Sequence, residues 1–323
     1  MASLKEIKNR ITSVQSTRKI TSAMKMVASS KLRHAQLMIE NMLPYEGMLE
    51  TILKSFMAAN IDAKGRFTEN REARHVVLIV YASNTSLCGA FNANIIKKMI
   101  STVEEYQRKK IDVTIYPIGR KISEKVKSLG YSSLGNYQSL TDAPNFQTCI
   151  QIGQELERKF IAGEIDRVEL IYHHFKSAGS QILTRKRLIP IDLEEAMDYD
   201  HTRDLKHIIT DEHVQEYLKE QGGHRALTGV KSKSEIKKFN DNYIIEPDMK
   251  TILQALIPRY INLMIYTALL DSNASEHAAR MVAMQTATDN ADELLHDLRL
   301  TYNKTRQAAI TAELLDIMGG SFQ

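Results

Sequence analysis

Two long helical patterns, one at each end of the chain, constrain the fold more than any other feature. Residues 3–59 repeat apolar side chains in helical steps, with Ser3 and Glu6 spaced as a capping box at the start. The stripe consists of Leu4, Ile7, Ile11, Val14, Ile20, Met24, Val27, Leu32, Ala35, Met38 and Met42. Such a helix would be roughly 80 Å long, far longer than a compact domain is wide. Pro44 is expected to kink it.

The C-terminal part of the chain, residues 247–323, repeats the pattern. Its stripe consists of Met281, Met284, Thr288, Ala291, Leu295, Leu298, Tyr302, Thr305, Ala309, Ala312 and Leu315. Small residues in a stripe let two helices approach closely. Residues 1–34 hold eight Lys or Arg and one acid, whereas residues 271–323 hold eight acids and four bases, so the two ends attract each other. We therefore predict an antiparallel two-helix coiled coil of residues 1–60 and 247–323.

Between these helices, residues 74–195 change to alternating strands and helices. Four segments predict strands, namely His75–Tyr81, Val113–Ile118, Arg167–Phe175 and Gln181–Ile191. Helical stretches are expected at 92–110, 119–129 and 146–162. This alternation predicts an α/β domain with a mainly parallel sheet. Residues 198–246 form a polar connection of mixed charge with little pattern.

Composition excludes several classes of protein. The sequence lacks the ~18 consecutive apolar residues of a membrane span, and its charged N-terminus lacks a secretory signal pattern. Cys88 and Cys149 are the only cysteines, which fits a reducing compartment without disulfides. The chain is therefore expected to be cytosolic, and not itself membrane-spanning.

The loop Asn84–Asn92 follows the first predicted strand, where α/β enzymes bind phosphates. It lacks both G-x-G-x-x-G and the P-loop pattern, so a tight turn into a helix is favoured over a nucleotide site. Cys88 has no neighbouring catalytic partners and is expected to be a structural cysteine. His173 and His174 should point to opposite faces of a strand and so cannot share a metal. We find no catalytic residues, and expect no cofactor and no metal.

Two surfaces suggest partners. The basic N-terminal helix offers an alternative function, a basic coiled-coil protein that binds nucleic acid or acts as a scaffold. Its cations interleave with an apolar stripe and no aromatic residue precedes Tyr45, which favours a protein partner over nucleic acid. The end of the chain, Ala308–Gln323, is apolar almost all round. We expect such an end to be enclosed, either by the N-terminal helix or, as we favour, by a surrounding partner.

Three blocks of sequence resemble the gamma-subunit family of bacterial F-type ATP synthases. They are Arg10–Ala28, Leu87–Asn92, and Ala274–Met284 running on to Tyr302–Leu314. Order and spacing agree over nearly the whole chain, and the last block is highly specific. The resemblance implies a non-catalytic rotor shaft that takes part in ATP synthesis and hydrogen ion transport. The coiled coil would lie inside a hexamer of alpha and beta subunits. The α/β domain would contact the epsilon subunit and the membrane-embedded c-subunit ring, with the delta subunit in the same complex.

The resemblance also carries over seven residues for partner contact and coupling. Met24 and Lys25 resemble the segment that meets an acidic lever loop on the beta subunit. On the C-terminal helix, the opposite side of that contact and the coupling region are resembled by Arg306, Gln307, Thr311 and Glu313. Arg280 resembles a position that couples the shaft to the catalytic sites. The implied location is peripheral, at the cytoplasmic face of the inner membrane. Asn84-Thr85-Ser86 stands where the family often has an acidic–Arg–Gly run.

Overall fold

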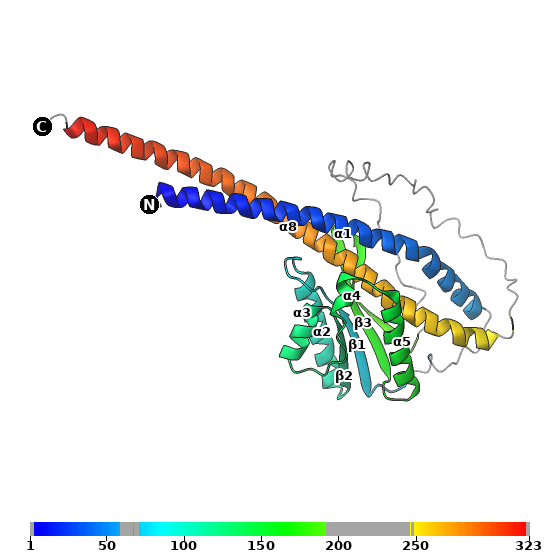
Figure 1. Ribbon diagram of the computed structural model, residues 1–323. Coiled ribbons are helices and arrows are strands. Elements are labelled where there is room, and N and C mark those ends of the chain that lie inside the picture. Colours follow the sequence, from blue (N-terminus) through cyan, green and yellow to red (C-terminus); the bar gives the residue numbers. More distant parts are fainter. Residues whose placement is uncertain (1–2, 59–66, 68–70, 192–245, 247–248, 321–323) are drawn as a thin grey trace.

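A rod of two antiparallel helices, with an α/β domain against one side, makes up the structure (Figure 1). The computed structural model describes residues 3–58, 67, 71–191, 246 and 249–320. Helix α1 covers Leu4–Ala58 and α8 covers Met249–Gly320, which are 55 and 72 residues. At 1.5 Å per residue these helices are roughly 80 and 110 Å long. The predicted pairing of the two chain ends is confirmed.

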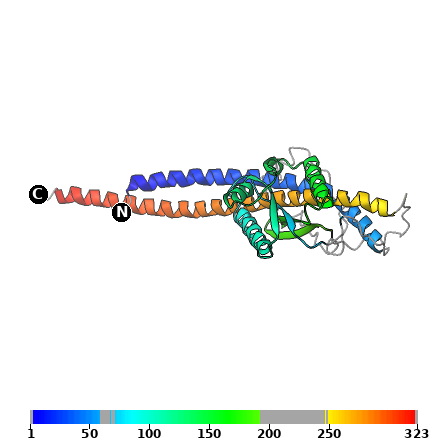
Figure 2. The same ribbon diagram turned by 90° about the horizontal axis from the view of Figure 1, so that it is seen from below.

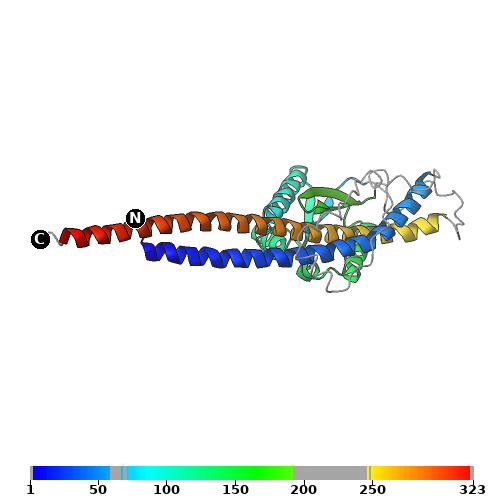
Figure 3. The ribbon, with the colours of Figure 1, turned by 90° about the horizontal axis from the view of Figure 1, so that it is seen from above.

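The start and the bend of α1 follow from its sequence. The Ser3 amide donates to Glu6 Oε2 at 2.8 Å, and the Glu6 amide donates to Ser3 Oγ at 3.2 Å. This reciprocal pair is the predicted capping box, which satisfies amides that the first helical turn leaves free. Pro44 lies inside α1. Figure 3 shows α1 bending away from α8 in the part near its C-terminal end, and a proline that removes a helical hydrogen bond accounts for such a bend.

The α/β domain is built on a four-stranded sheet of order β2-β1-β3-β4. The strands are β1 (His75–Tyr81), β2 (Asp112–Ile118), β3 (Arg167–Ser177) and β4 (Ser180–Ile189). Strand β1 pairs in parallel with both β2 and β3, whereas β4 returns antiparallel to β3. The mainly parallel sheet is therefore confirmed. From Val76 to Tyr81 every residue of β1 is buried, as expected of a central strand covered on both faces.

Helices cover the two faces of the sheet separately. The helices of the domain are α2 (Phe91–Arg108), α3 (Arg120–Ser128), α4 (Gln138–Asp142) and α5 (Phe146–Ile161). Alternate residues of β1 divide between two cores. Val76, Leu78 and Val80 pack with residues of α2 and α3, whereas Val77, Ile79 and Tyr81 pack with residues of α5 and α8. The sequence did not indicate α4, which is only five residues long.

The rod forms part of the second core. Helix α8 packs against β3 and α5, and α1 lies along α8. Figure 2 shows that the domain occupies one half of the rod while the other half projects beyond it. The two helices thus form a rod that is anchored on the α/β domain along one half and projects beyond it along the other. The predicted polar connection 198–246 lies outside the described residues, except for Glu246.

Candidate functional site

The structure divides the seven predicted contact residues between two places. Met24 and Lys25 on α1 and Arg280 on α8 lie near the point where the rod leaves the domain. The remaining four, Arg306, Gln307, Thr311 and Glu313, are exposed on the projecting part of α8. Since Arg280 and Arg306 are 26 residues apart on one helix, they are separated by roughly 40 Å. The structure therefore places Met24 close to Arg280. It keeps both of them distant from Arg306, Gln307, Thr311 and Glu313.

Met24 and Arg280 line one hollow between the two helices and the loop that follows β1. Its volume is about 410 Å³. It is lined by Ala23, Met24, Val27, Ala28, Lys31, Thr85, Ser86, Leu87, His277 and Arg280. Most of the wall is apolar, with two cations, Lys31 and Arg280, at its polar side. Burial, together with the charges of Arg280 and Lys31, lowers the pKa of His277 to about 4, so this imidazole is neutral near pH 7.

Arg280 connects the rod to the domain. Its Nη1 donates to Glu276 Oε1 at 2.6 Å, one turn earlier on α8, and the arginine side chain is only 11% exposed. Its Nη2 donates to Thr85 Oγ1 at 2.7 Å and also approaches the backbone oxygens of Thr85 and Ser86, each at 3.4 Å. Burial raises the pKa of Glu276, and the Arg280 charge counteracts that rise. The Arg280 guanidinium is therefore bonded within this chain, to Glu276 on α8 and to the loop after β1.

The loop that receives Arg280 is held by its own polar groups. Ser83 Oγ donates to Thr85 O at 2.6 Å, and Asn92 Nδ2 donates to Ser83 Oγ at 2.7 Å. Cys88 is 1% exposed, with its Sγ 3.2 Å from Asn92 Nδ2, so the structural interpretation of this cysteine is confirmed. Gly89, at φ +58°, turns the chain into α2. The favoured prediction of a tight turn into a helix is therefore confirmed.

His173 and His174 are both buried and have different neighbours. The His173 ring stacks on Phe91 with centroids 4.5 Å apart, and burial lowers its pKa to about 4. His174 Nδ1 lies 2.7 Å from Asp271 Oδ2 on α8. Among the described residues, no cluster of three His, Cys, Asp or Glu has an arrangement suited to a metal ion.

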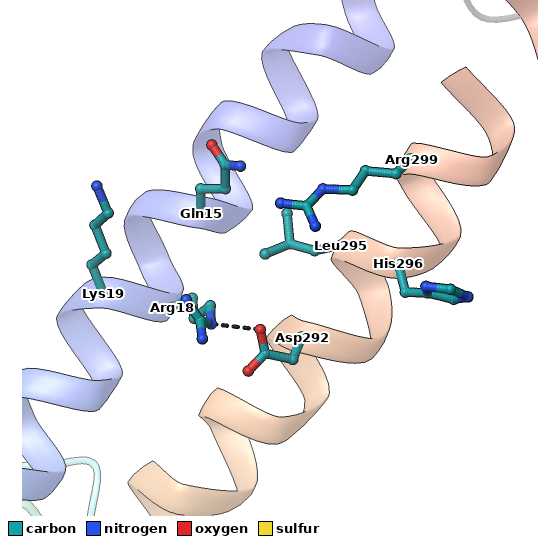
Figure 4. Close-up of a pocket in the computed structure, with 7 residues that line it drawn as sticks. All are labelled: Gln15, Arg18, Lys19, Asp292, Leu295, His296 and Arg299. Atoms are coloured by element: carbon teal, nitrogen blue, oxygen red, sulfur yellow. Dashed lines mark ion pairs between the residues drawn. The ribbon is translucent and has the colours of Figure 1, made fainter. Parts of the chain in front are cut away.

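A second hollow, of about 440 Å³, lies between α1 and α8 on the projecting rod (Figure 4). It is lined by Gln15, Arg18, Lys19, Asp292, Leu295, His296 and Arg299. Arg18 Nε lies 2.5 Å from Asp292 Oδ1, and this ion pair joins the basic helix to the acidic one. Both partners are about half exposed, so the pair guides register more than it stabilises. Lys19 and Arg299 make this face of the rod basic.

The register of the two helices leaves the end of α8 uncovered. Thr21 Oγ1 lies 2.9 Å from Thr288 Oγ1, so in antiparallel helices Leu4 lies level with about residue 305. In Figures 1 and 2, α8 extends beyond the N-terminus of α1. Apolar side chains on this overhang are 48–70% exposed, namely Ile310, Leu314, Leu315, Ile317 and Met318. The alternative in which the N-terminal helix covers the apolar end is therefore wrong, because α1 is too short to reach it.

Sequence reasoning missed the polar residues that fix α8 to the domain. Asn273 Nδ2 donates to Thr141 O at 2.6 Å, and Ser275 Oγ donates to His173 O at 3.1 Å. Together with Asp271 they interrupt an otherwise apolar buried stretch of α8. The mainly polar run 271–277 between apolar residues was the feature of the sequence that could have indicated these contacts.

Comparison with known proteins decides the family. A family model described as ATP synthase matches residues 3–322. The chain is 48% identical over 324 residues to the ATP synthase gamma chain of Bacteroides thetaiotaomicron, covering 100% of both chains. It is 50% identical over 322 residues to that of Bacteroides fragilis, covering 99% of each. The chain belongs to the ATP synthase gamma-chain family. The resemblance of the three sequence blocks is thereby confirmed.

Solved structures agree with this family in fold. The central stalk with c-ring of the Tetrahymena thermophila mitochondrial ATP synthase contains a chain with a TM-score of 0.54 and 24% identity, covering 83% of this chain and 99% of that one. The rotor of the Euglena gracilis mitochondrial enzyme gives 0.55 and 20%, covering 95% and 98%. At these identities the likeness is one of fold, a long coiled coil on an α/β base. No helix within the described ranges is long and apolar enough to cross a membrane.

Proposed function

We propose that this chain is the central rotor shaft of a proton-translocating F-type ATP synthase. It would couple ion flow through the membrane ring to conformational cycling of the catalytic beta subunits. The observation that carries the proposal is the uncovered apolar end of α8, which projects beyond α1 at the tip of a rod. A side chain such as Ile317, 70% exposed, is costly in water and is stabilised by an enclosing partner.

An enclosing hexamer of alpha and beta subunits fits this tip. Apolar contacts are non-directional, so an apolar tip can be held in a sleeve while it turns. The polar residues Arg306 and Gln307 are exposed on α8 just below the tip, Glu313 is exposed within it, and Met24 and Lys25 lie on the other helix. A rod with different side chains on each flank presents a different surface to each beta subunit. Turning such a rod shifts each beta subunit among its conformations by differential contact free energy.

The remaining proposed partners are those of the α/β domain, which forms the base of the rod. The α/β domain would rest on the c-subunit ring and the epsilon subunit, with the delta subunit elsewhere in the same complex. The chain would then be a peripheral protein at the cytoplasmic face of the inner membrane. It would itself be non-catalytic, with ATP chemistry left to the beta subunits. Moving one conformational equilibrium from 1:99 to 99:1 requires about 5.5 kcal/mol of differential contact, which several contacts on a rod flank can supply.

The test is assembly and rotation. The chain is combined with alpha and beta subunits of a Bacteroides relative, and a bead is attached to Lys127, an exposed residue on α3. We expect unidirectional rotation of the bead when ATP is added. Arg306→Ala combined with Gln307→Ala should weaken rotation without changing the unfolding temperature of the free chain, because both residues are exposed. Lys97→Ala, an exposed change on α2, is the matched control. Hydrolysis by the hexamer without rotation of the bead would reject the proposal.

A further inference from the structure

Five residues within a short length of α8 form hydrogen bonds or ion pairs with the described part of the α/β domain. Tyr81 donates to Ile265 O at 3.0 Å, His174 pairs with Asp271 at 2.7 Å, Asn273 donates to Thr141 O at 2.6 Å, Ser275 donates to His173 O at 3.1 Å and Arg280 donates to Thr85 Oγ1 at 2.7 Å. From Ile265 to Arg280 these contacts span roughly 22 Å of the helix axis. They reach the end of β1, the residues His173 and His174 within β3, helix α4 and the loop after β1.

Helix α1 meets the same region through an apolar cluster. Leu32, Ala35 and Ile39 of α1 pack in an apolar cluster with Phe175 of β3 and Ala274 of α8. Apolar packing has no preferred direction along the surface, whereas a hydrogen bond weakens steeply when its angle changes. Bonds distributed along α8 therefore resist rotation of that helix relative to the sheet more strongly than the apolar contact of α1 does.

We propose that these bonds form a torsional clamp that makes the α/β domain and α8 one mechanical body, with Arg280 and Thr85 as positioning residues at its outer end. The inference rests on the proposed rotor function, since only a turning shaft needs torsional stiffness at this junction. Torque then enters the rod through α8, and α1 follows as the supporting helix.

The outer end of the clamp is suited to this role because both of its sides are fixed. On α8, Glu276 holds the Arg280 guanidinium from one turn away, and Glu276 is 5% exposed. On the domain, Arg120 donates from its amide to Asn84 Oδ1 at 2.8 Å, which ties the loop to the start of α3. Asn84 Nδ2 in turn donates to Asp142 Oδ2 at 2.7 Å. Arg280 thus bonds to a loop that is braced by two helices.

The first test uses the free chain and does not depend on the rotor function. Thr85→Val removes the hydroxyl acceptor with little change in volume, and Thr85→Ser retains it. Hydrogen bonds to charged groups are the stronger class, so losing this one should raise amide exchange in the loop 84–90 by about tenfold. Exchange in β1 should not change, and Thr85→Ser should restore the slow rate. An unchanged loop rate in Thr85→Val would overturn the clamp.

The second test uses the assembled complex with a non-hydrolysable nucleotide, which holds the rod tip still. Angular fluctuation of a probe on Lys127 then reports the stiffness of the junction. We expect broader fluctuation in Thr85→Val and recovery in Thr85→Ser. Thr21→Val is the matched control, because it breaks the Thr21–Thr288 bond between α1 and α8 and leaves the domain contacts intact. Equal broadening in Thr21→Val would show that α1 transmits the torque and would overturn the inference.

The two tests separate the inference from the function on which it rests. If the chain fails to assemble with the hexamer, the proposed function fails while exchange in the free chain still reports the clamp. If the chain assembles and rotates but Thr85→Val changes neither the exchange rate nor the fluctuation, the function stands and the clamp is rejected.

Discussion

His174 Nδ1 on β3 lies 2.7 Å from Asp271 Oδ2 on α8, and the two residues are 4% and 0% exposed. The pair crosses the interface between the sheet and the rod, beside the apolar cluster that contains Leu270 and Ala274. A buried carboxylate is strongly unfavourable unless polar groups satisfy it, and the imidazole that β3 supplies is one group that does so for Asp271. The contact therefore specifies one position of α8 on the sheet, where apolar packing alone would allow several.

Replacing Asp271 by Ala should destabilise the chain strongly. Removing the Asp271 carboxylate takes away a buried hydrogen bond of His174, and such a loss costs about 1–3 kcal/mol in the free energy of unfolding. Urea denaturation of the free chain, followed by circular dichroism, measures the change. Asp292→Ala is the control, since the Arg18–Asp292 pair is half exposed and worth less than about 1 kcal/mol. Equal midpoints for the two variants would contradict the structural role of the buried pair.

Gly119→Ala should also be severely destabilising, at the junction between β2 and α3. Gly119 has φ +106°, and a Cβ there would lie 2.0 Å from the backbone oxygen of Ala82. Both left-handed strain and a clash with backbone oppose a side chain, so we expect a loss above about 3 kcal/mol. Gly130→Ala separates the two causes, because Gly130 has φ +70° and open space around it. It should cost only about 1–2 kcal/mol in the same denaturation experiment.

Much of this fold could be predicted because its signals are local. The spacing of apolar residues identified both rod helices, and the runs HVVLIVY and RVELIYHHF identified β1 and β3. The charge difference between the two ends indicated their pairing, and the Arg18–Asp292 contact shows the attraction at atomic scale. Helix α4 was missed because five residues are too few to display a period.

The contacts that join α8 to the α/β domain were harder to predict, because the two residues of each contact are distant in sequence. Arg280 meets Thr85 across 195 positions, and Asp271 meets His174 across 97. No local spacing encodes such pairs. The sequence did show that the C-terminal end is apolar, but whether α1 covers it depends on register. That register is fixed by contacts such as Thr21 with Thr288.

Glu157 on α5 should make stability depend on pH. It is 9% exposed, and burial raises its pKa to about 7, so the folded chain keeps it protonated where the unfolded chain ionises it. The free energy of unfolding therefore falls as pH rises from about 4.5 to about 7. Glu157→Gln removes this loss and should stabilise the chain at pH 8 by up to about 3 kcal/mol, with no gain at pH 4.5. Thermal melts of the variant and the parent at both pH values measure the difference.

Glu155, two positions earlier on α5, provides the control with the opposite sign. The hydrogen bond from Lys159 lowers the pKa of Glu155, opposed by partial burial, and Tyr116 also donates to this carboxylate. The ionised carboxylate is therefore the stabilising form, and its contribution is lost as pH falls. Glu155→Gln should lower the melting temperature at pH 8 and have less effect at pH 4. A gain at pH 8 from both substitutions would contradict the assignment of the two carboxylates.

Polar substitution at the tip of α8 should change association but not folding. Leu314, Leu315 and Ile317 are 57%, 63% and 70% exposed and lie beyond the reach of α1. Replacing all three with Gln should leave the melting temperature of the free chain unchanged, and sedimentation should show less self-association. Because a fully buried side chain of this size contributes about 1.5–3 kcal/mol, affinity for an enclosing alpha–beta hexamer should fall by more than about tenfold. Leu298→Gln is the contrasting control, since Leu298 is buried between the two helices and its replacement should lower the melting temperature. Unchanged hexamer affinity in the triple variant would mean that the tip of α8 is not the part of the rod that the hexamer encloses.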